Sequence, residues 1–114
     1  MRAMDLTAKK CVACQGGEKP LAPDEIKVYL NEVDRGWSLD GIRIVRIFKF
    51  RDFGKAMEFV NKVAEIAESE GHHPDMHIEG WNKVRIELYT HAIRGLHQND
   101  FIVAAKIDRL EKSY

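Results

Sequence analysis

Two adjacent histidines followed by a proline form the stretch of this chain best suited to chemistry. His72, His73 and Pro74 follow a long amphipathic segment, and His77 lies close by. Imidazole ordinarily titrates near neutral pH, so it can donate or accept a proton there without a metal or cofactor. Pro74 ends any helix and keeps His73 extended. The pattern predicts acid–base groups held on a fixed turn, the alternative being a solvated polar loop.

Two carboxylates are candidates to support these imidazoles. Glu68 lies one helical turn before the pair, at the border of an apolar stripe, so we expect it to be half-buried beside the histidines; the alternative is an ordinary surface residue. Asp100 lies in the first turn of the last predicted helix, where a carboxylate is favoured by the helix dipole. Its position favours capping over catalysis.

The same stretch has a second interpretation as a metal site. His72, His73, Asp75 and His77 are four candidate ligands within six residues, and His91 is a possible fifth. Such a cluster could hold Zn²⁺ or another divalent ion and support hydrolysis. Pro74 counts against this hypothesis because it denies His73 and His77 a shared helical face.

The first twenty residues predict an N-terminal arm, separate from a domain over 21–114. The arm contains Cys11 and Cys14 in a C-x-x-C pattern, which is typical of half a zinc site or a redox pair. No second pair exists to complete a zinc site, and the polar, Gly-rich stretch that follows does not resemble the helix of a thioredoxin-like motif. The pattern is therefore a weak signal.

Length and charge exclude several classes of protein. A chain of 114 residues predicts one domain, small enough that self-association is a fair expectation. Its 18 basic and 18 acidic residues cancel, which argues against binding to nucleic acid or an anionic membrane. No apolar run reaches membrane-spanning length, and residues 1–10 have no signal-peptide core, so we expect a cytoplasmic protein.

Hydrophobic periodicity predicts helices and hairpins in alternation. Pro23 starts the first helix and Gly36 ends it, Asp40-Gly41 turns the first hairpin, and Asp52 and Gly71 cap the long helix. The predicted elements are a helix from Pro23, strands 37–39 and 42–50, a helix 53–70, strands 76–81 and 84–89, and a helix 99–112. This α-β-β-α-β-β-α order predicts a single α+β domain, a four-stranded antiparallel sheet with helices on one face.

The long helix carries more apolar surface than a one-sided sheet needs. Phe59 and Ile66 flank its predicted stripe, and we expect the surplus to form a helix–helix contact between subunits. The stripe contains Phe53, Ala56, Met57, Val60, Val63, Ala64 and Ala67. In strand 42–50, Ile44, Phe48 and Phe50 point one way and Val45 and Ile47 the other, so another subunit is expected to cover part of the sheet.

An ordered set of motifs resembles the pterin-4a-carbinolamine dehydratases. The set consists of E-x-x-x-H-H-P from Glu68 to Pro74, an aromatic-N-K-V stretch from Trp81, Thr90-His91, and Asp100. Nine residues separate Trp81 from His91 and eight separate His91 from Asp100, as in the family's pattern. The resemblance runs from about Leu21 to Leu110, and the C-x-x-C arm is similar to an extension in some bacterial and plant members.

Three departures from the family's pattern are visible. Between Pro74 and Trp81 the chain has one residue more than usual, and we expect Gly80 to absorb it as a β-bulge. Ala92 follows His91 where a Glu is common. His97 takes the N-cap position of the last helix, usually a Ser, and predicts a weaker cap.

The resemblance implies a hydro-lyase that converts a 4a-hydroxytetrahydropterin, the product of aromatic amino-acid hydroxylases, to the quinonoid dihydropterin in tetrahydrobiopterin recycling. His72 and His91 would flank C4a and protonate the departing hydroxyl, while His73 would lie nearest the N5 proton. Glu68 would orient a histidine, Pro74 would fix the turn, Trp81 would wall the flat ring, and Asp100 would support the site. No cofactor or metal is needed.

Alternatives remain open at this level. Some members of the family act as dimerisation or assembly cofactors through the long helix, and this chain could do so beside or instead of catalysis. The resemblance permits a homodimer or a homotetramer. The identity of the pterin, and which histidine is acid and which base, are not readable from the residues.

Overall fold

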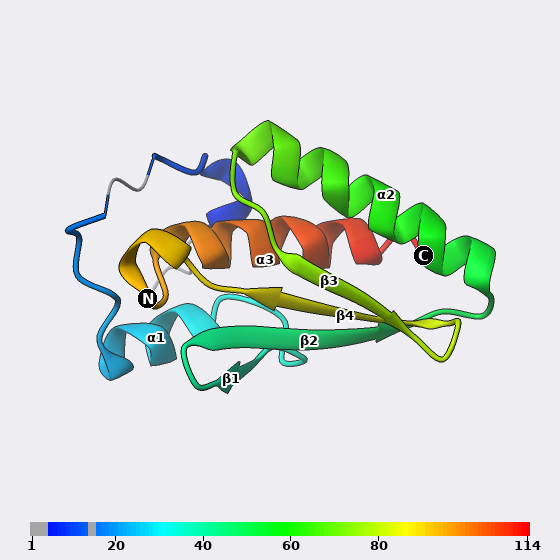
Figure 1. Cartoon of the computed structure of the whole chain (residues 1–114), viewed down its shortest axis with the longest axis horizontal. Helices are drawn as coiled ribbons and strands as arrows, with labels where there is room; N and C mark the ends of the chain where they lie inside the picture. Colours follow the sequence, from blue (N-terminus) through cyan, green and yellow to red (C-terminus); the bar gives the residue numbers. More distant parts are fainter. Residues whose placement is uncertain (1–4, 14–15) are drawn as a thin grey trace.

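The computed structural model describes residues 5–13 and 16–114, which form three α-helices, four strands and two short 3₁₀ turns. The order of the helices and strands confirms the predicted one (Figure 1). The elements are η1 (Leu6–Ala8), α1 (Pro23–Leu30), β1 (Ser38–Asp40), β2 (Arg43–Lys49), α2 (Phe53–Glu70), β3 (Asp75–Glu79), β4 (Lys83–Leu88), η2 (His91–Ile93) and α3 (Gln98–Glu111).

All four strands form one antiparallel sheet in the order β1-β2-β4-β3. Its buried face carries Ile44 and Phe48 from β2 and Val84, Ile86 and Leu88 from β4. Helices α2 and α3 lie over this face (Figure 1). The predicted α+β architecture is therefore confirmed, and the alternation predicted for β2 holds, since Ile47 on the opposite face is 59% exposed.

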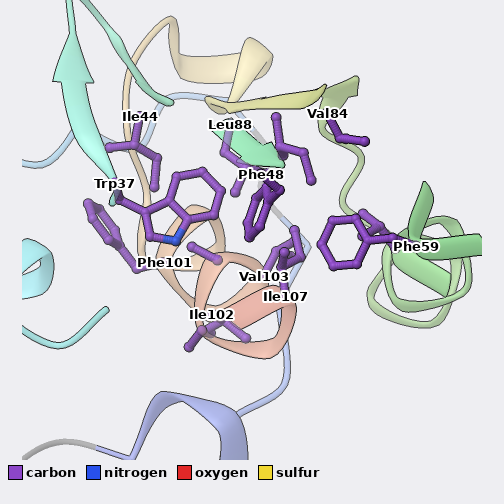
Figure 2. Packing of buried hydrophobic residues seen from close by; sticks show 14 of the residues in the cluster. Trp37, Ile44, Phe48, Phe59, Val84, Leu88, Phe101, Ile102, Val103 and Ile107 are labelled. Atoms are coloured by element: carbon purple, nitrogen blue, oxygen red, sulfur yellow. The ribbon is translucent and has the colours of Figure 1, made fainter. Parts of the chain in front are cut away.

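Aromatic rings fill the space between the sheet and the two long helices. Phe48 and Phe59 lie with ring centroids 4.8 Å apart, and Trp37 meets Phe48 edge-on at 6.3 Å (Figure 2). From α3, Phe101, Val103 and Ile107 are fully buried against them. This packing fixes the position of α3, whose first turn carries Asp100.

Helix α2 begins and ends where its caps predict. The Asp52 carboxylate accepts a hydrogen bond from the Lys55 backbone N–H at 2.7 Å, and Gly71 adopts the left-handed conformation (φ 65°) that ends the helix. The predicted apolar stripe was displaced, however. Phe59, expected on the flank, is fully buried, whereas Phe53, expected in the stripe, is 52% exposed. The helix is thus rotated so that Phe59, and not Phe53, meets the sheet.

Turn positions also differ from the prediction. The first helix ends at Leu30, well before Gly36, and its apolar side chains are only partly buried. Asp40 pairs with Arg43, so the first hairpin turns one residue later than predicted, at 41–42.

The extra residue before Trp81 does not form a β-bulge. β3 pairs with β4 without interruption from Asp75–Glu87 to Glu79–Lys83, and residues 80–82 make the turn. Gly80 and Trp81 both have positive φ there, at 54° and 59°. The turn has lengthened and the register of the strand is unaffected.

Residues 5–13 do not form a free arm. Leu6, in η1, is 2% exposed and belongs to the hydrophobic core, where it packs beside α3. Cys11 is partly buried against the same core. Cys14 lies outside the described residues. Among those that the structure describes, no helix is long and apolar enough to cross a membrane.

Candidate functional site

The imidazole of His72 is fixed by a fully buried carboxylate. His72 begins the connection from α2 to β3, and its Nε2 lies 2.6 Å from Oδ1 of Asp100, in the first turn of α3. Asp100 has no exposed surface, and only 12% of the His72 side chain is exposed. The two residues are 28 positions apart in the chain, so the fold alone brings them together.

Asp100 both caps α3 and binds the histidine. Its Oδ2 accepts hydrogen bonds from the Thr90 hydroxyl at 2.8 Å and from the His97 backbone N–H at 2.9 Å. The capping role expected for this residue is therefore real but incomplete. As an ionised carboxylate Asp100 can only accept, so the shared proton lies on Nε2 of His72 and the other ring nitrogen, Nδ1, is left for a ligand.

The second histidine of the pair is held more loosely. His73 Nε2 lies 2.7 Å from Oε2 of Glu68, in the last turns of α2. The His73 and Glu68 side chains are 61% and 77% exposed, so the expectation of a half-buried Glu68 was wrong. Glu68 nevertheless orients His73, with Nδ1 again the free nitrogen.

The segment that carries His91 is linked to the Asp100 carboxylate through Thr90. Thr90, which donates to Asp100, immediately precedes His91, the first residue of η2. His91 is exposed, and its Nδ1 lies 2.7 Å from the Tyr89 hydroxyl. When the phenol donates, Nε2 carries the ring proton and His91 presents a hydrogen-bond donor.

Two residues predicted to support the site have different placements. Pro74 is half-buried in the connection between α2 and β3, directly after the histidines. Trp81 lies in the β3–β4 turn, at the opposite end of the molecule from the α2–β3 connection, and is 59% exposed (Figure 1). The structure does not bring Trp81 to the histidines of its own chain, because β3 runs away from them.

The histidine-rich stretch does not converge on a metal-binding geometry. Across residues 5–13 and 16–114, no group of three or more His, Cys, Asp or Glu side chains is arranged to hold a metal ion. His77 points to the outer side of the sheet, where its Nε2 lies 3.5 Å from Glu87, while His72 points to Asp100. The two rings are separated because His77 lies within β3, on the outer face of the sheet, whereas His72 lies in the connection before β3.

Sequence reasoning missed two residues that shape this site. Thr90 was noted only as part of a motif, and Tyr89 only as the end of a strand. The N-cap position predicted for His97 is confirmed, since its Nδ1 accepts a hydrogen bond from the Asn99 backbone N–H at 3.0 Å. With Asp100 three residues later it forms a capping box.

The arrangement is suited to proton transfer. Two imidazoles are each oriented by a carboxylate through Nε2, and a third is oriented by a phenol through Nδ1. The second nitrogen of each ring can then serve as a proton donor or acceptor, as general acid–base chemistry requires.

Comparison with known proteins identifies the family to which this geometry belongs. Residues 19–110 match the family described as pterin 4 alpha carbinolamine dehydratase. A putative pterin-4-alpha-carbinolamine dehydratase of Methylococcus capsulatus is 49% identical over 112 residues, covering 96% of both chains. Pterin-4-alpha-carbinolamine dehydratase 2, mitochondrial, of Arabidopsis thaliana is 45% identical over 94% of this chain and 59% of its own length.

Solved structures agree with the fold. A transcriptional coactivator/pterin dehydratase from Brucella melitensis superposes with a TM-score of 0.75 at 34% identity, over 82% of this chain and 99% of its own. A pterin dehydratase-like protein described as a RuBisCO assembly factor has a TM-score of 0.54 at 21% identity over 66% of this chain and 86% of its own, and shares the fold alone. The matched family model, the extent of the identity and the shared architecture together establish that this chain belongs to the pterin-4-alpha-carbinolamine dehydratase family.

Proposed function

We propose that this protein dehydrates a 4a-hydroxytetrahydropterin to the quinonoid dihydropterin by histidine acid–base catalysis, as a hydro-lyase of tetrahydrobiopterin recycling. The observation that carries the proposal is the hydrogen bond between His72 and the fully buried Asp100, which also accepts from Thr90 beside His91. Through these two hydrogen bonds, Asp100 links the turn that carries His72 to the segment that follows β4.

The reaction needs two proton transfers and no external electron acceptor. The C4a–O bond breaks as the hydroxyl takes a proton and leaves as water. The N5–H bond breaks, and its electrons form the new C4a=N5 double bond. An acid near the hydroxyl and a base near N5 are sufficient, and imidazoles serve as both near neutral pH.

In our assignment, His72 and His91 flank C4a and protonate the departing hydroxyl, while His73 takes the N5 proton. Glu68 supports the last role, because it accepts the Nε2 proton of His73 and leaves Nδ1 as the basic nitrogen. Tyr89 supports the acid role of His91 by holding its Nδ1: in the imidazolium form Nδ1–H donates to the phenol oxygen, and Nε2–H is the proton given to the departing hydroxyl. Pro74 keeps His73 on the turn.

The test is the decay of a 4a-hydroxytetrahydropterin, followed spectroscopically, with wild-type protein and with His72→Ala, His73→Ala and His91→Ala. Each variant should lower kcat by about 10²-fold or more, as expected for loss of a general acid or base. His77→Ala is the matched control, since His77 lies on the outer side of the sheet, and it should keep the wild-type rate. Wild-type rates in all three site variants would refute the assignment.

We also propose that the protein self-associates through α2. The support is apolar surface that the core leaves unused: Phe53 is 52% exposed, and Met57, Val60 and Ala64 are only partly buried. Burying this row against a second copy would remove it from water. Light scattering should show an oligomer that Phe53→Glu weakens, whereas Phe53→Leu, which keeps the apolar surface, should not.

A further inference from the structure

The N-terminal strap, residues 11–13 and 16–18, contacts the neighbours of the proposed site residues. It crosses the end of α2, the start of α3 and the η2 loop. The family match begins at residue 19, so the strap lies outside the part of the chain that matches the family model. Cys11 and Val12 make hydrogen bonds to the buried side chains of Glu70 and Asn99.

The first contact is made by Glu70, the last residue of α2. Its Oε1 accepts from the Cys11 backbone N–H at 2.8 Å, and its Oε2 accepts from Nζ of Lys106, in α3, at 2.5 Å. Only 6% of the Glu70 side chain is exposed. Glu70 therefore ties the strap and α3 to the helix end that lies two residues before His72.

The second contact is made by Asn99, which immediately precedes Asp100. The Asn99 amide accepts from the Val12 N–H at 3.1 Å and donates to the Val12 carbonyl at 2.7 Å, so it pairs with the strap as a neighbouring strand would. Asn99 is 2% exposed. The thiol of Cys11 donates to the Asn99 carbonyl at 3.6 Å, and burial together with the Glu70 carboxylate raises the pKa of Cys11 to about 12, so this donor stays protonated.

The strap also passes beside His91. Gly16 approaches the carbonyl oxygen of Ala92, the residue after His91. Glu18 then reaches Nε2 of His97, the cap of α3, at 3.5 Å. The strap thus lies beside each of the three segments that supply the proposed site, which are the end of α2, the start of α3 and the η2 loop.

We propose that the strap is a positioning element of the active site, acting through Glu70 and Asn99, which hold the end of α2 and the start of α3 at the separation that the His72–Asp100 hydrogen bond requires. The kinetic part of this inference rests on the proposed function. The structural part of the inference is independent of the proposed function, because it concerns only how the strap holds His72 against Asp100.

The physical reason is that one short hydrogen bond joins the end of α2 to the start of α3. The His72–Asp100 bond is 2.6 Å long and joins residues on opposite sides of the α2–α3 contact, so a small separation of the helices breaks it. Misplacement of a reacting group by about 1 Å can cost on the order of 10²-fold in rate. The strap resists that separation, because it forms hydrogen bonds with the Glu70 carboxylate on α2 and the Asn99 amide on α3.

Kinetics of full-length variants provide the first test. Glu70→Ala and Asn99→Ala remove the two strap contacts, and Glu65→Ala and Asn61→Ala are matched controls on the exposed side of α2. At a temperature where circular dichroism shows all proteins folded, the first two should lose about tenfold in kcat with KM within about twofold, and the controls should not change. Glu70→Gln, whose amide oxygen can still accept from Cys11, should recover most of the rate.

The tautomer of His72 provides a test that needs no activity. In ¹⁵N NMR the wild-type ring should show a single Nε2–H form, and Glu70→Ala and Asn99→Ala should show a mixture of tautomers. An unchanged tautomer in both variants, or unchanged kcat in both, would overturn the proposal. A wild-type protein without dehydratase activity, in which the variants still shift the tautomer, would instead overturn the proposed function and leave the strap inference standing.

Discussion

Helix α3 carries two buried aspartates, Asp100 and Asp108, and their comparison separates chemistry from architecture. Asp100 is fully buried and Asp108 is 8% exposed. Each accepts hydrogen bonds from three groups. By residue type, burial and number of donors they are nearly equivalent.

The difference lies in the partners. Asp108 accepts from the Asp34 backbone N–H at 2.9 Å, from Nε1 of Trp37 at 2.8 Å and from the guanidinium of Arg46. None of these donors loses its proton near neutral pH. Burial raises the pKa of Asp108, although the hydrogen bonds from Asp34 and Trp37 and the Arg46 charge oppose it. Asp108 therefore joins α3 to the segment before β1 and to β2.

Asp100 has one partner of another kind. Beside a backbone N–H and a hydroxyl it binds an imidazole, whose second nitrogen is free to exchange a proton. A buried carboxylate becomes part of a candidate site when one of its donors can change protonation state. Burial and hydrogen-bond count alone do not distinguish the two aspartates.

The largest effect is expected from Asp100→Asn. An amide offers one acceptor oxygen in place of two and no charge, so His72 loses its orientation, and kcat should fall by about 10³-fold, equivalent to about 4 kcal/mol. Stopped-flow dehydration assays at several pH values measure it. A fall of less than threefold would show that the buried carboxylate only caps α3.

Asp108→Asn is the matched substitution on the same helix, and it should lower the stability of the fold instead of the rate of catalysis. Loss of a buried ion pair and of one acceptor should lower the free energy of unfolding by about 2–3 kcal/mol, measured by urea denaturation. Arg46 retains Asp34 and Glu111 nearby, at 3.5 and 3.4 Å, which limits the loss. The kcat of the folded protein should not change; a loss comparable to that of Asp100→Asn would end the distinction.

Thr90→Val sharpens the comparison by removing a single donor from Asp100. The side chain keeps its shape, so the expected cost is about 1 kcal/mol of stability and a several-fold fall in kcat. Thr7→Val, whose hydroxyl bonds to the exposed Asp5, is the control and should leave both quantities unchanged. Thermal melts with parallel rate measurements are sufficient, and a neutral Thr90→Val would mean that Asp100 needs only its two other donors.

The smallest effect concerns Glu70, the α2 carboxylate that binds the strap. Burial opposes its ionisation, but hydrogen bonds from the Cys11 backbone and from Lys106 outweigh burial and hold its pKa below the ordinary 4.5. A lowered folded-state pKa stabilises the fold above pH 4.5, and that stability is lost as the pH falls through the lowered value. The advantage of wild type over Glu70→Gln in unfolding free energy, about 1 kcal/mol at pH 7, should therefore shrink below pH 4.5. A difference independent of pH would contradict this role of the Glu70 charge.

Much of the fold could be predicted from local chemistry. Asp52 and Gly71 act within one turn of their own positions, and the alternation of β2 reports its buried face directly. The face of α2 could not be fixed in the same way. Apolar residues cover so much of that helix that periodicity permits more than one rotation, and contact with Phe48 and Phe50 selected Phe59 over Phe53.

The candidate site was predictable in its members but not in its connections. His72 and His73 follow from their types and from Pro74, whereas the partner of His72 lies 28 residues away. Trp81 was predicted beside the histidines, but it lies at the far end of β3. A sequence motif does not specify the direction in which the strand between its members runs. The arm was expected to be separate because it has no periodicity, yet Leu6 completes the core.

By itself, the sequence determined which groups can exchange protons near neutral pH, where the helices and strands occur, and which caps end α2, since all of these depend on residues within a few positions of one another. Only the tertiary structure decided that Asp100 meets His72 while Asp108 meets Arg46, and that the N-terminal strap closes over both helix ends. The physical reason is that these contacts join distant segments, and their geometry is set by how two helices pack on one sheet.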